Sequence, residues 1–188
     1  TLSPDGDGFF TGITTATSIN VGSGITLSSD GNAFHTGIVT ATSVTGVGTV
    51  TSVTASGIDL SGLLREGVNI TAGKLSDNTN IDLEDGMVHL FTTQETTTST
   101  PNIRFSSSVT LNDVMQIGES IAVTIITTAA AGGYSAQLTI DGAAVTENWV
   151  GGSAPSDGGS SGVDIHAYTI IKTASATFTV IANQSKTS

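Results

Sequence analysis

The sequence contains no cysteine and few cations, and each shortage excludes a class of protein. Without cysteine there are neither disulfides nor thiolate metal ligands, so stability has to come from packing or from assembly. Lys and Arg together number 5 against 16 Asp and Glu, which gives a formal net charge of −11. Because each contact with a phosphate needs a cation, nucleic acid and anionic membranes are poor candidate partners.

A membrane span and a signal peptide are also missing from the sequence. No stretch of about 20 apolar residues is present, so we expect no membrane insertion. The N-terminus TLSPDGDG has neither a Met nor a basic-then-apolar signal pattern. We therefore expect the chain to be a fragment that begins inside a repeat, with an N-terminal attachment region missing.

The residues that are abundant favour β-structure. Thr, Ser, Gly, Val, Ile and Ala make up most of the chain, and only 11% of the residues are charged. β-branched residues favour strands, whereas helices with charged faces need more Lys, Arg and Glu than this chain offers. The composition predicts an all-β protein.

A 25-residue repeat occupies the N-terminal part. LSPDGDGFFTGITTATSIN, starting at Leu2, returns as LSSDGNAFHTGIVTATSVT, starting at Leu27. Each unit reads as a turn, a strand with one thin apolar face, and a Gly-rich turn. Because two such units cannot bury that face alone, identical chains have to cover it. We predict a homotrimeric fibrous β-shaft over residues 1–60, intertwined about a three-fold axis.

The C-terminal part has longer strands and different turns. Six or more apolar runs separated by Gly, Asn, Asp and Ser predict a β-sandwich or jelly-roll head over residues 80–188, joined to the shaft by a neck at 61–79. Asp-Gly steps in LEDGMV at 83–88 and IDGAAV at 140–145 predict hairpin turns. The run GGSAPSDGGSSG at 151–162 predicts a loop, either a surface excursion or a binding loop.

No motif in the sequence indicates catalysis or a cofactor. Asp5 and Asp7 lie two residues apart, as in calcium loops, but the other ligands of such a loop are absent. The histidines are His35, His89 and His166. A trimer could bring three copies of one histidine to its axis around a metal, but a surface or interface position is the simpler interpretation. We expect no enzyme, no cofactor and no metal.

Two segments resemble a known group of proteins. The units TGITTATSI and TGIVTATSV resemble the GIVTATSF-type repeats of virion structural and tail-fibre-like proteins of marine cyanophages. The run from Leu138 to the final NQSKTS is similar to the C-terminal module of the same proteins, and its ending resembles their native terminus. The resemblance implies a trimeric fibre on the virion surface, with the shaft toward the virion, the head outward, and other virion proteins bound through the missing N-terminal region.

Two hypotheses for function follow from this resemblance and from the exposed loops. In the first, the head binds a glycan or protein on the host cell surface. Trp149, Tyr134 and Tyr168 would stack on sugar rings, with Asp157 and His166 as further receptor-binding candidates. For Trp149, the alternative is a core position between the sheets.

The second hypothesis is structural. The chain would then be a capsid-decorating or collar fibre whose head mainly starts and locks trimerisation. A third possibility, a polysaccharide depolymerase, needs a constellation of carboxylates in a groove, and the acidic residues are spread too thinly for one.

Overall fold

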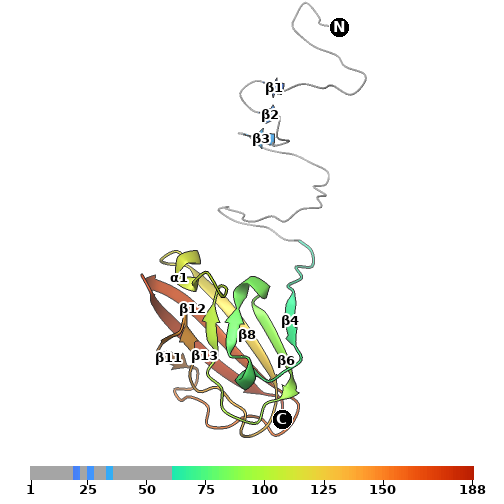
Figure 1. Cartoon of the computed structure of the whole chain (residues 1–188), viewed down its shortest axis with the longest axis vertical. Coiled ribbons are helices and arrows are strands. Elements are labelled where there is room, and N and C mark those ends of the chain that lie inside the picture. The colour runs from blue at the N-terminus through green and yellow to red at the C-terminus, as the bar shows by residue number, and fades with distance from the viewer. Residues whose placement is uncertain (1–18, 22–24, 28–32, 36–60) are drawn as a thin grey trace, which may run out of the picture. The chain divides into compact units, whose positions relative to one another are not determined.

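The computed structural model describes residues 19–21, 25–27, 33–35 and 61–188 of a chain that divides into two units, 1–58 and 59–188. In the first unit, β1 (Ile19–Val21), β2 (Ile25–Leu27) and β3 (Ala33–His35) form an antiparallel sheet in the order β1-β2-β3 (Figure 1). The rest of the predicted shaft lies outside the described residues, and for these three strands the structure describes the backbone alone.

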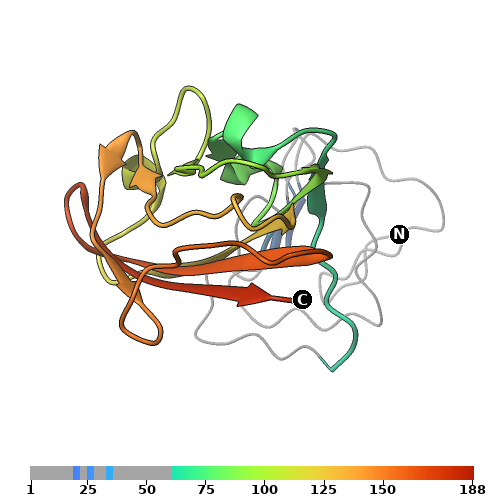
Figure 2. The ribbon, with the colours of Figure 1, turned by 90° about the horizontal axis from the view of Figure 1, so that it is seen from below.

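The second unit is a sandwich of two β-sheets (Figure 2). The larger sheet has six strands in the order β11-β13-β12-β8-β6-β4: Glu147–Trp149, Thr177–Lys186, Val163–Ala174, Ser120–Thr128, Val88–Gln94 and Val68–Thr71. The smaller has four in the order β10-β9-β7-β5: Ala143–Ala144, Thr139–Ile140, Asn102–Arg104 and Asn80–Asp82. Short helices η1 (Leu75–Asp77), η2 (Leu83–Asp85) and α1 (Leu111–Val114) connect them. The all-β class is confirmed.

The core lies between the two sheets because alternate residues of their strands point inward. The central strands β8 and β12 alternate between buried and less buried positions, as strands with one face on a core do. The smaller sheet contributes Ile81, Ile103 and Ile140, each at most 1% exposed. The larger sheet contributes Phe91, Val123, Ile125, Tyr168, Ile170, Val180 and Ala182.

Most neighbouring strands of the sandwich run parallel. The pairs β4/β6, β6/β8, β5/β7, β7/β9 and β11/β13 are parallel, while β8/β12, β12/β13 and β9/β10 are antiparallel. A jelly roll pairs its strands antiparallel, so these pairings differ from that expectation. From β4 to β9 the chain instead passes back and forth between the sheets, so β4, β6 and β8 run in one direction in the larger sheet, and β5, β7 and β9 run in one direction in the smaller sheet.

The two Asp-Gly steps have different outcomes. The step at Asp141 and Gly142 makes the predicted hairpin between β9 and β10, with φ of 51° and 79°, as a tight hairpin turn requires. The hairpin predicted at 83–88 is wrong. There η2 buries Leu83 in the core and leads from β5 in the smaller sheet to β6 in the larger one. Gly86, with a φ of 121°, ends this helical turn instead of closing a hairpin.

The C-terminal domain begins earlier than residue 80. The segment 61–79, predicted as a neck, contributes β4 at the edge of the six-stranded sheet. It also contributes Leu75, which is 1% exposed in the core. The segment predicted as a neck from its composition therefore supplies one strand and one core residue to the compact unit at 59–188.

A buried carboxylate at Glu95 joins the end of β6 to η1. Glu95 is 1% exposed and accepts hydrogen bonds from the backbone N–H of Ser76 at 2.8 Å, the Ser76 hydroxyl at 2.7 Å, and the backbone N–H groups of Thr96 and Thr97 at 3.0 and 3.3 Å. Burial by itself raises the pKa of Glu95, but these hydrogen bonds together lower it. The carboxylate is therefore stabilised in its ionised form.

Replacing Glu95 should make the free energy of unfolding less dependent on pH in the acid range. A folded pKa below the unfolded value stabilises the fold above about pH 4.3, and this contribution disappears as pH falls through the folded pKa. We expect Glu95→Gln to lower the free energy of unfolding by about 1–3 kcal/mol at neutral pH, and the deficit to shrink toward acid pH.

Urea unfolding measured from neutral to acid pH tests this prediction. The control is Glu84→Gln, because Glu84 is exposed and its carboxylate accepts no hydrogen bond from the described residues. If the loss of unfolding free energy in the Glu95 variant stays constant with pH, the Glu95 carboxylate is not stabilised in its ionised form and the prediction is wrong.

Candidate functional site

The outward face of the four-stranded sheet is polar. Strands β5, β7 and β9 direct isoleucines into the core, so the residues that alternate with them point away from it. The parallel register aligns Asn80 with Asn102 and Asn102 with Thr139, and it aligns Asp82 with Arg104. Two rows of polar side chains therefore cross this face.

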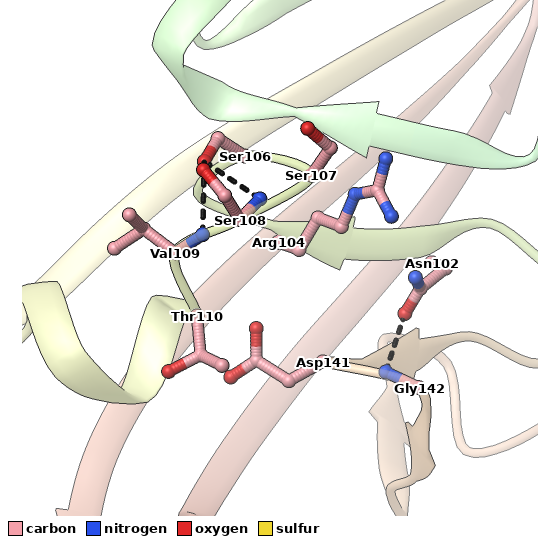
Figure 3. Close-up of a pocket in the computed structure, with 9 residues that line it drawn as sticks. All are labelled: Asn102, Arg104, Ser106, Ser107, Ser108, Val109, Thr110, Asp141 and Gly142. Carbon is pink, nitrogen blue, oxygen red and sulfur yellow. Dashed lines mark hydrogen bonds between the residues drawn. The ribbon is translucent and has the colours of Figure 1, made fainter.

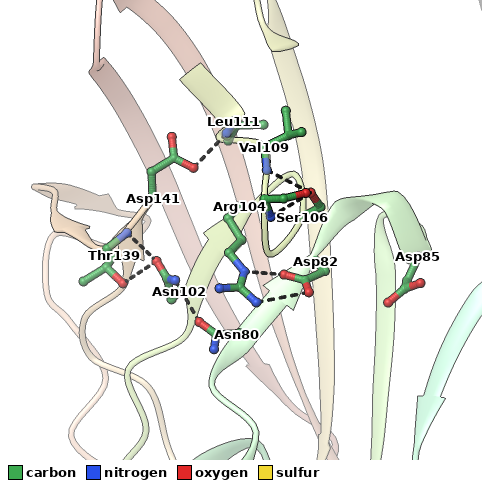
Figure 4. A network of polar contacts seen from close by, with 12 residues as sticks. Asn80, Asp82, Asp85, Asn102, Arg104, Ser106, Val109, Leu111, Thr139 and Asp141 are labelled. Carbon is green, nitrogen blue, oxygen red and sulfur yellow. Dashed lines mark hydrogen bonds and ion pairs between the residues drawn. The ribbon is translucent and has the colours of Figure 1, made fainter. Parts of the chain in front are cut away.

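Asn102 organises the first row (Figure 4). Its Nδ2 donates to Oδ1 of Asn80 at 2.9 Å, and its Oδ1 accepts the Thr139 hydroxyl at 2.9 Å and the Gly142 N–H at 2.7 Å. One amide thus holds β5, β9 and the β9–β10 turn together. The hydrogen bonds fix the shape of the face before any ligand binds.

The second row is an ion pair. Arg104 donates through Nε to Oδ1 of Asp82 at 2.5 Å and through Nη2 to Oδ2 at 3.2 Å, a two-point contact that fixes the guanidinium plane. The hydrogen bond from Arg104 to Asp82 raises the pKa of Arg104. Nη1 donates to none of the described residues, and the arginine side chain is 25% exposed. Arg104 therefore keeps a donor for a ligand while its charge is balanced.

A cavity of about 330 Å³ lies beside these rows (Figure 3). We call it the serine groove; it is lined by Asn102, Arg104, Ser106, Ser107, Ser108, Val109, Thr110, Asp141 and Gly142. The loop at 106–110 forms one wall of the groove. Its shape is held by Ser106, whose hydroxyl accepts hydrogen bonds from the N–H groups of Val109 at 3.0 Å and Ser108 at 3.3 Å. Ser107 is exposed, and its hydroxyl has no partner among the described residues.

Asp141 connects the two walls of the serine groove. From the β9–β10 turn its Oδ1 accepts the Leu111 N–H at 2.7 Å and its Oδ2 accepts the Asn112 N–H at 3.0 Å. These N–H groups open α1, where helical partners are lacking. Because both carboxylate oxygens are engaged, Asp141 serves as a cap that positions the wall.

A second cavity of about 350 Å³ adjoins the serine groove and shares Thr110 and Asp141 with it. Its remaining lining is mostly apolar, with Phe178 as the aromatic residue, and comprises Asn112, Asp113, Ile140, Ala143, Ala144, Val145, Ala176 and Phe178. The combined surface offers amide, hydroxyl and guanidinium groups at one end and an aromatic ring at the other.

Three of the predicted receptor-binding residues line two further cavities. Trp149 and Asp157 line one of about 240 Å³, and Tyr134 lines another of about 340 Å³. The two cavities share Ala154, so the loop at 151–162 forms part of both. Trp149 also packs against the core, so its side chain combines the two positions that the sequence left open.

The loop at 151–162 is irregular, as predicted, but it is firmly attached. Asp157 forms an ion pair with Lys186 at 2.6 Å, and the Gly159 N–H donates to Oδ2 of Asp164 at 2.8 Å. A Cβ at Gly158 would stand against the carbonyl oxygens of Ala130 and Gly133. Only glycine allows this close approach, which fixes the base of the loop.

His166 and Tyr168 lie beneath the surface. They are 1% and 2% exposed on the inward face of β12, so neither side chain is available to a receptor. Burial lowers the pKa of His166 to about 4, against the opposing effect of Asp164, and burial raises the pKa of Tyr168. Both groups are therefore neutral near neutral pH and act as parts of the core.

Of the other two histidines, His89 is buried and His35 lies in β3. His89 is 2% exposed, its Nε2 lies 2.9 Å from the carbonyl oxygen of Gly86, and burial lowers its pKa. Only the backbone of His35 is described, in β3. Across the described residues, no three His, Asp or Glu side chains gather as metal ligands, and no helix is long and apolar enough to cross a membrane.

The residues of the serine groove were missed at the sequence level. A hydroxyl-rich loop is readable in SSSVT at 106–110, shortly after the strand NIR. What brings this loop to Asp141 and Phe178 is the pairing of β7 with β9 and the position of α1, and neither is encoded by a local motif.

No model of a known protein family, no curated protein and no solved structure matches this chain. The candidate site is therefore defined by its own geometry. Preorganised hydrogen-bonding groups beside an aromatic ring suit the binding of a hydroxylated ligand.

Removing the Asp141 carboxylate should loosen the groove wall. We expect Asp141→Ala to lower the free energy of unfolding by about 1–2 kcal/mol, because two N–H groups at the start of α1 lose their acceptor. Chemical denaturation measures the loss, and Asp77→Ala is the control because Asp77 is exposed and bonds to none of the described side chains. Equal stability of the two variants would show that the cap contributes nothing.

Proposed function

We propose that residues 61–188 form the attachment head of a homotrimeric phage fibre and bind a glycan on the host cell surface. The observation that carries the proposal is the serine groove with its extension to Phe178. Sugars present hydroxyl groups at their edges and apolar C–H faces to aromatic rings, and this surface offers partners for both.

The electrostatics favour an uncharged glycan. The chain carries a net charge of −11, which opposes the approach of polyanions. Arg104, the cation of the groove, is balanced by Asp82. Hydroxyl and amide groups such as those of Ser107 and Asn102 recognise neutral sugars without a charge requirement.

Trp149, Tyr134 and Asp157 add further surface for the same ligand class. They line cavities that meet at Ala154, on a loop held in place from below. Trp149 ends β11 and packs against the core, so its ring loses little conformational entropy when a ligand binds. These residues are accordingly proposed as secondary contacts of the head.

The wider setting follows from the resemblance of the repeats. We propose a virion-surface fibre that is not an enzyme, with a trimeric shaft at 1–60 and other virion proteins bound further toward the N-terminus. The structural alternative, a capsid-decorating or collar fibre, keeps the trimer and gives the head an assembly role. Cell binding separates the two proposals.

Blocking the groove should abolish attachment. We expect Ser107→Trp in the full chain to reduce binding to marine cyanobacterial cells at least about tenfold, because the indole fills the cavity from an exposed position. The matched control is Gln116→Trp, which is exposed and outside the described cavities. Flow cytometry with fluorescently labelled protein gives the readout.

The outcomes of this experiment distinguish the hypotheses. Undiminished binding of the Ser107 variant rejects the serine groove as the site, and Trp149→Ala then tests the loop cavities. No binding by the unmodified chain, with trimers intact, contradicts the attachment role and favours the structural alternative.

The proposed trimer can be tested by measuring the mass of the protein in solution. Light scattering coupled to size-exclusion chromatography should give three times the chain mass of 18.8 kDa, because the apolar face of the repeats needs neighbouring chains. A mass of one chain would overturn the trimeric shaft.

A further inference from the structure

The outward face of the six-stranded sheet carries an apolar row that crosses four strands. The register places Ile70 of β4 beside Leu90 of β6, then Ile126 of β8, then Ile165 of β12. A second row on the same face runs through Val68, Val88, Thr124 and Ala167. We call the surface made by these eight residues the uncharged sheet face.

This face is open where it reaches the sheet edge. Ile70 is 64% exposed and Val68 46%, both on the edge strand β4 (Figure 1). Leu63 and Leu64, just before β4, are 86% and 75% exposed. Contiguous apolar exposure of this kind marks an interaction surface in soluble proteins.

The charge pattern indicates which partner fits. None of the outward residues of β4, β6, β8, β12 and β13 is Asp, Glu, Lys or Arg, although the chain has a net charge of −11. Identical acidic chains repel each other, so a surface without charge is where contact between two copies costs least electrostatic energy. A basic partner would instead be drawn to the acidic surfaces.

The position of β4 in the chain points to the same partner. It is the first strand described in the unit at 59–188, separated from residue 60 by seven residues that reach at most roughly 25 Å. Chains joined through their repeats would therefore hold their heads within contact distance of one another.

We infer that the uncharged sheet face is where the heads of neighbouring copies of this chain meet. The inference rests on the proposed homotrimer and adds the residues through which the heads associate. It also leaves the serine groove free, because that groove lies over the outward face of the other sheet.

A charge placed on this face tests the inference. In the full chain we expect Ile70→Lys to weaken association at least about tenfold in sedimentation velocity, because three like charges would meet at one interface. The matched control is Ile117→Lys, because Ile117 is 66% exposed and lies outside the sheets. Circular dichroism and thermal unfolding verify that both variants fold.

Thiol labelling identifies what covers the face. The chain has no cysteine, so Ile70→Cys and Ile117→Cys each introduce a single reactive site for a maleimide dye. We expect the label to react slowly at position 70 in the assembled chain and faster on dilution, while position 117 reacts fast throughout.

Each outcome decides a separate point. A monomeric unmodified chain overturns both the homotrimer and the contact between heads. An oligomer that Ile70→Lys weakens no more than Ile117→Lys keeps the homotrimer and overturns this face. Protection of the thiol in the Ile70→Cys variant that is independent of concentration shows that the chain covers the face with its own residues, which also overturns the inference.

Discussion

In-register parallel pairing of β5, β7 and β9 is the constraint on which the core and the candidate site both depend. Because side chains alternate along a strand, the register that directs Ile81, Ile103 and Ile140 inward must direct Asn102 and Arg104 outward. A slip of one residue would place the polar rows in the core and the isoleucines in water. Burial of the isoleucines therefore holds the hydrogen-bonding face in its position.

The short helix α1 connects this face to the larger sheet. Asp141 caps its first N–H groups, while Lys172 of β12 donates through Nζ to the carbonyl oxygens of Asn112 and Met115 at 2.5 and 2.8 Å. Oδ1 of Asn112 in turn accepts the N–H of Ala176 in the β12–β13 turn. The groove wall is thus tied to both sheets, and its shape depends on the whole domain.

The two outward faces of the sandwich differ in chemistry and in proposed role. The smaller sheet presents hydrogen-bonding groups and a balanced ion pair, which suit a hydroxylated ligand. The larger sheet presents aliphatic residues without charge, which suit a copy of the same chain. Because the faces lie on opposite layers, the heads can associate through one while the other stays accessible.

Composition and Asp-Gly turns act locally, so the β class, the loop at 151–162 and the hairpin at Asp141 could be predicted from the residues alone. The sequence also singled out Trp149 and Tyr134, which line cavities. Local patterns misled where an Asp-Gly step ended η2, and they missed β4, whose strand character depends on pairing with β6. Which polar residues share a surface depends on long-range strand pairing and could not be predicted from local patterns. Parallel strands are joined by connections that cross between the sheets, so no turn motif in the sequence predicts that β7 lies beside both β5 and β9.

The burial of His166 and Tyr168 also depends on tertiary packing. An alternating strand shows that one face is inward, and the packing of the second sheet determines which face that is.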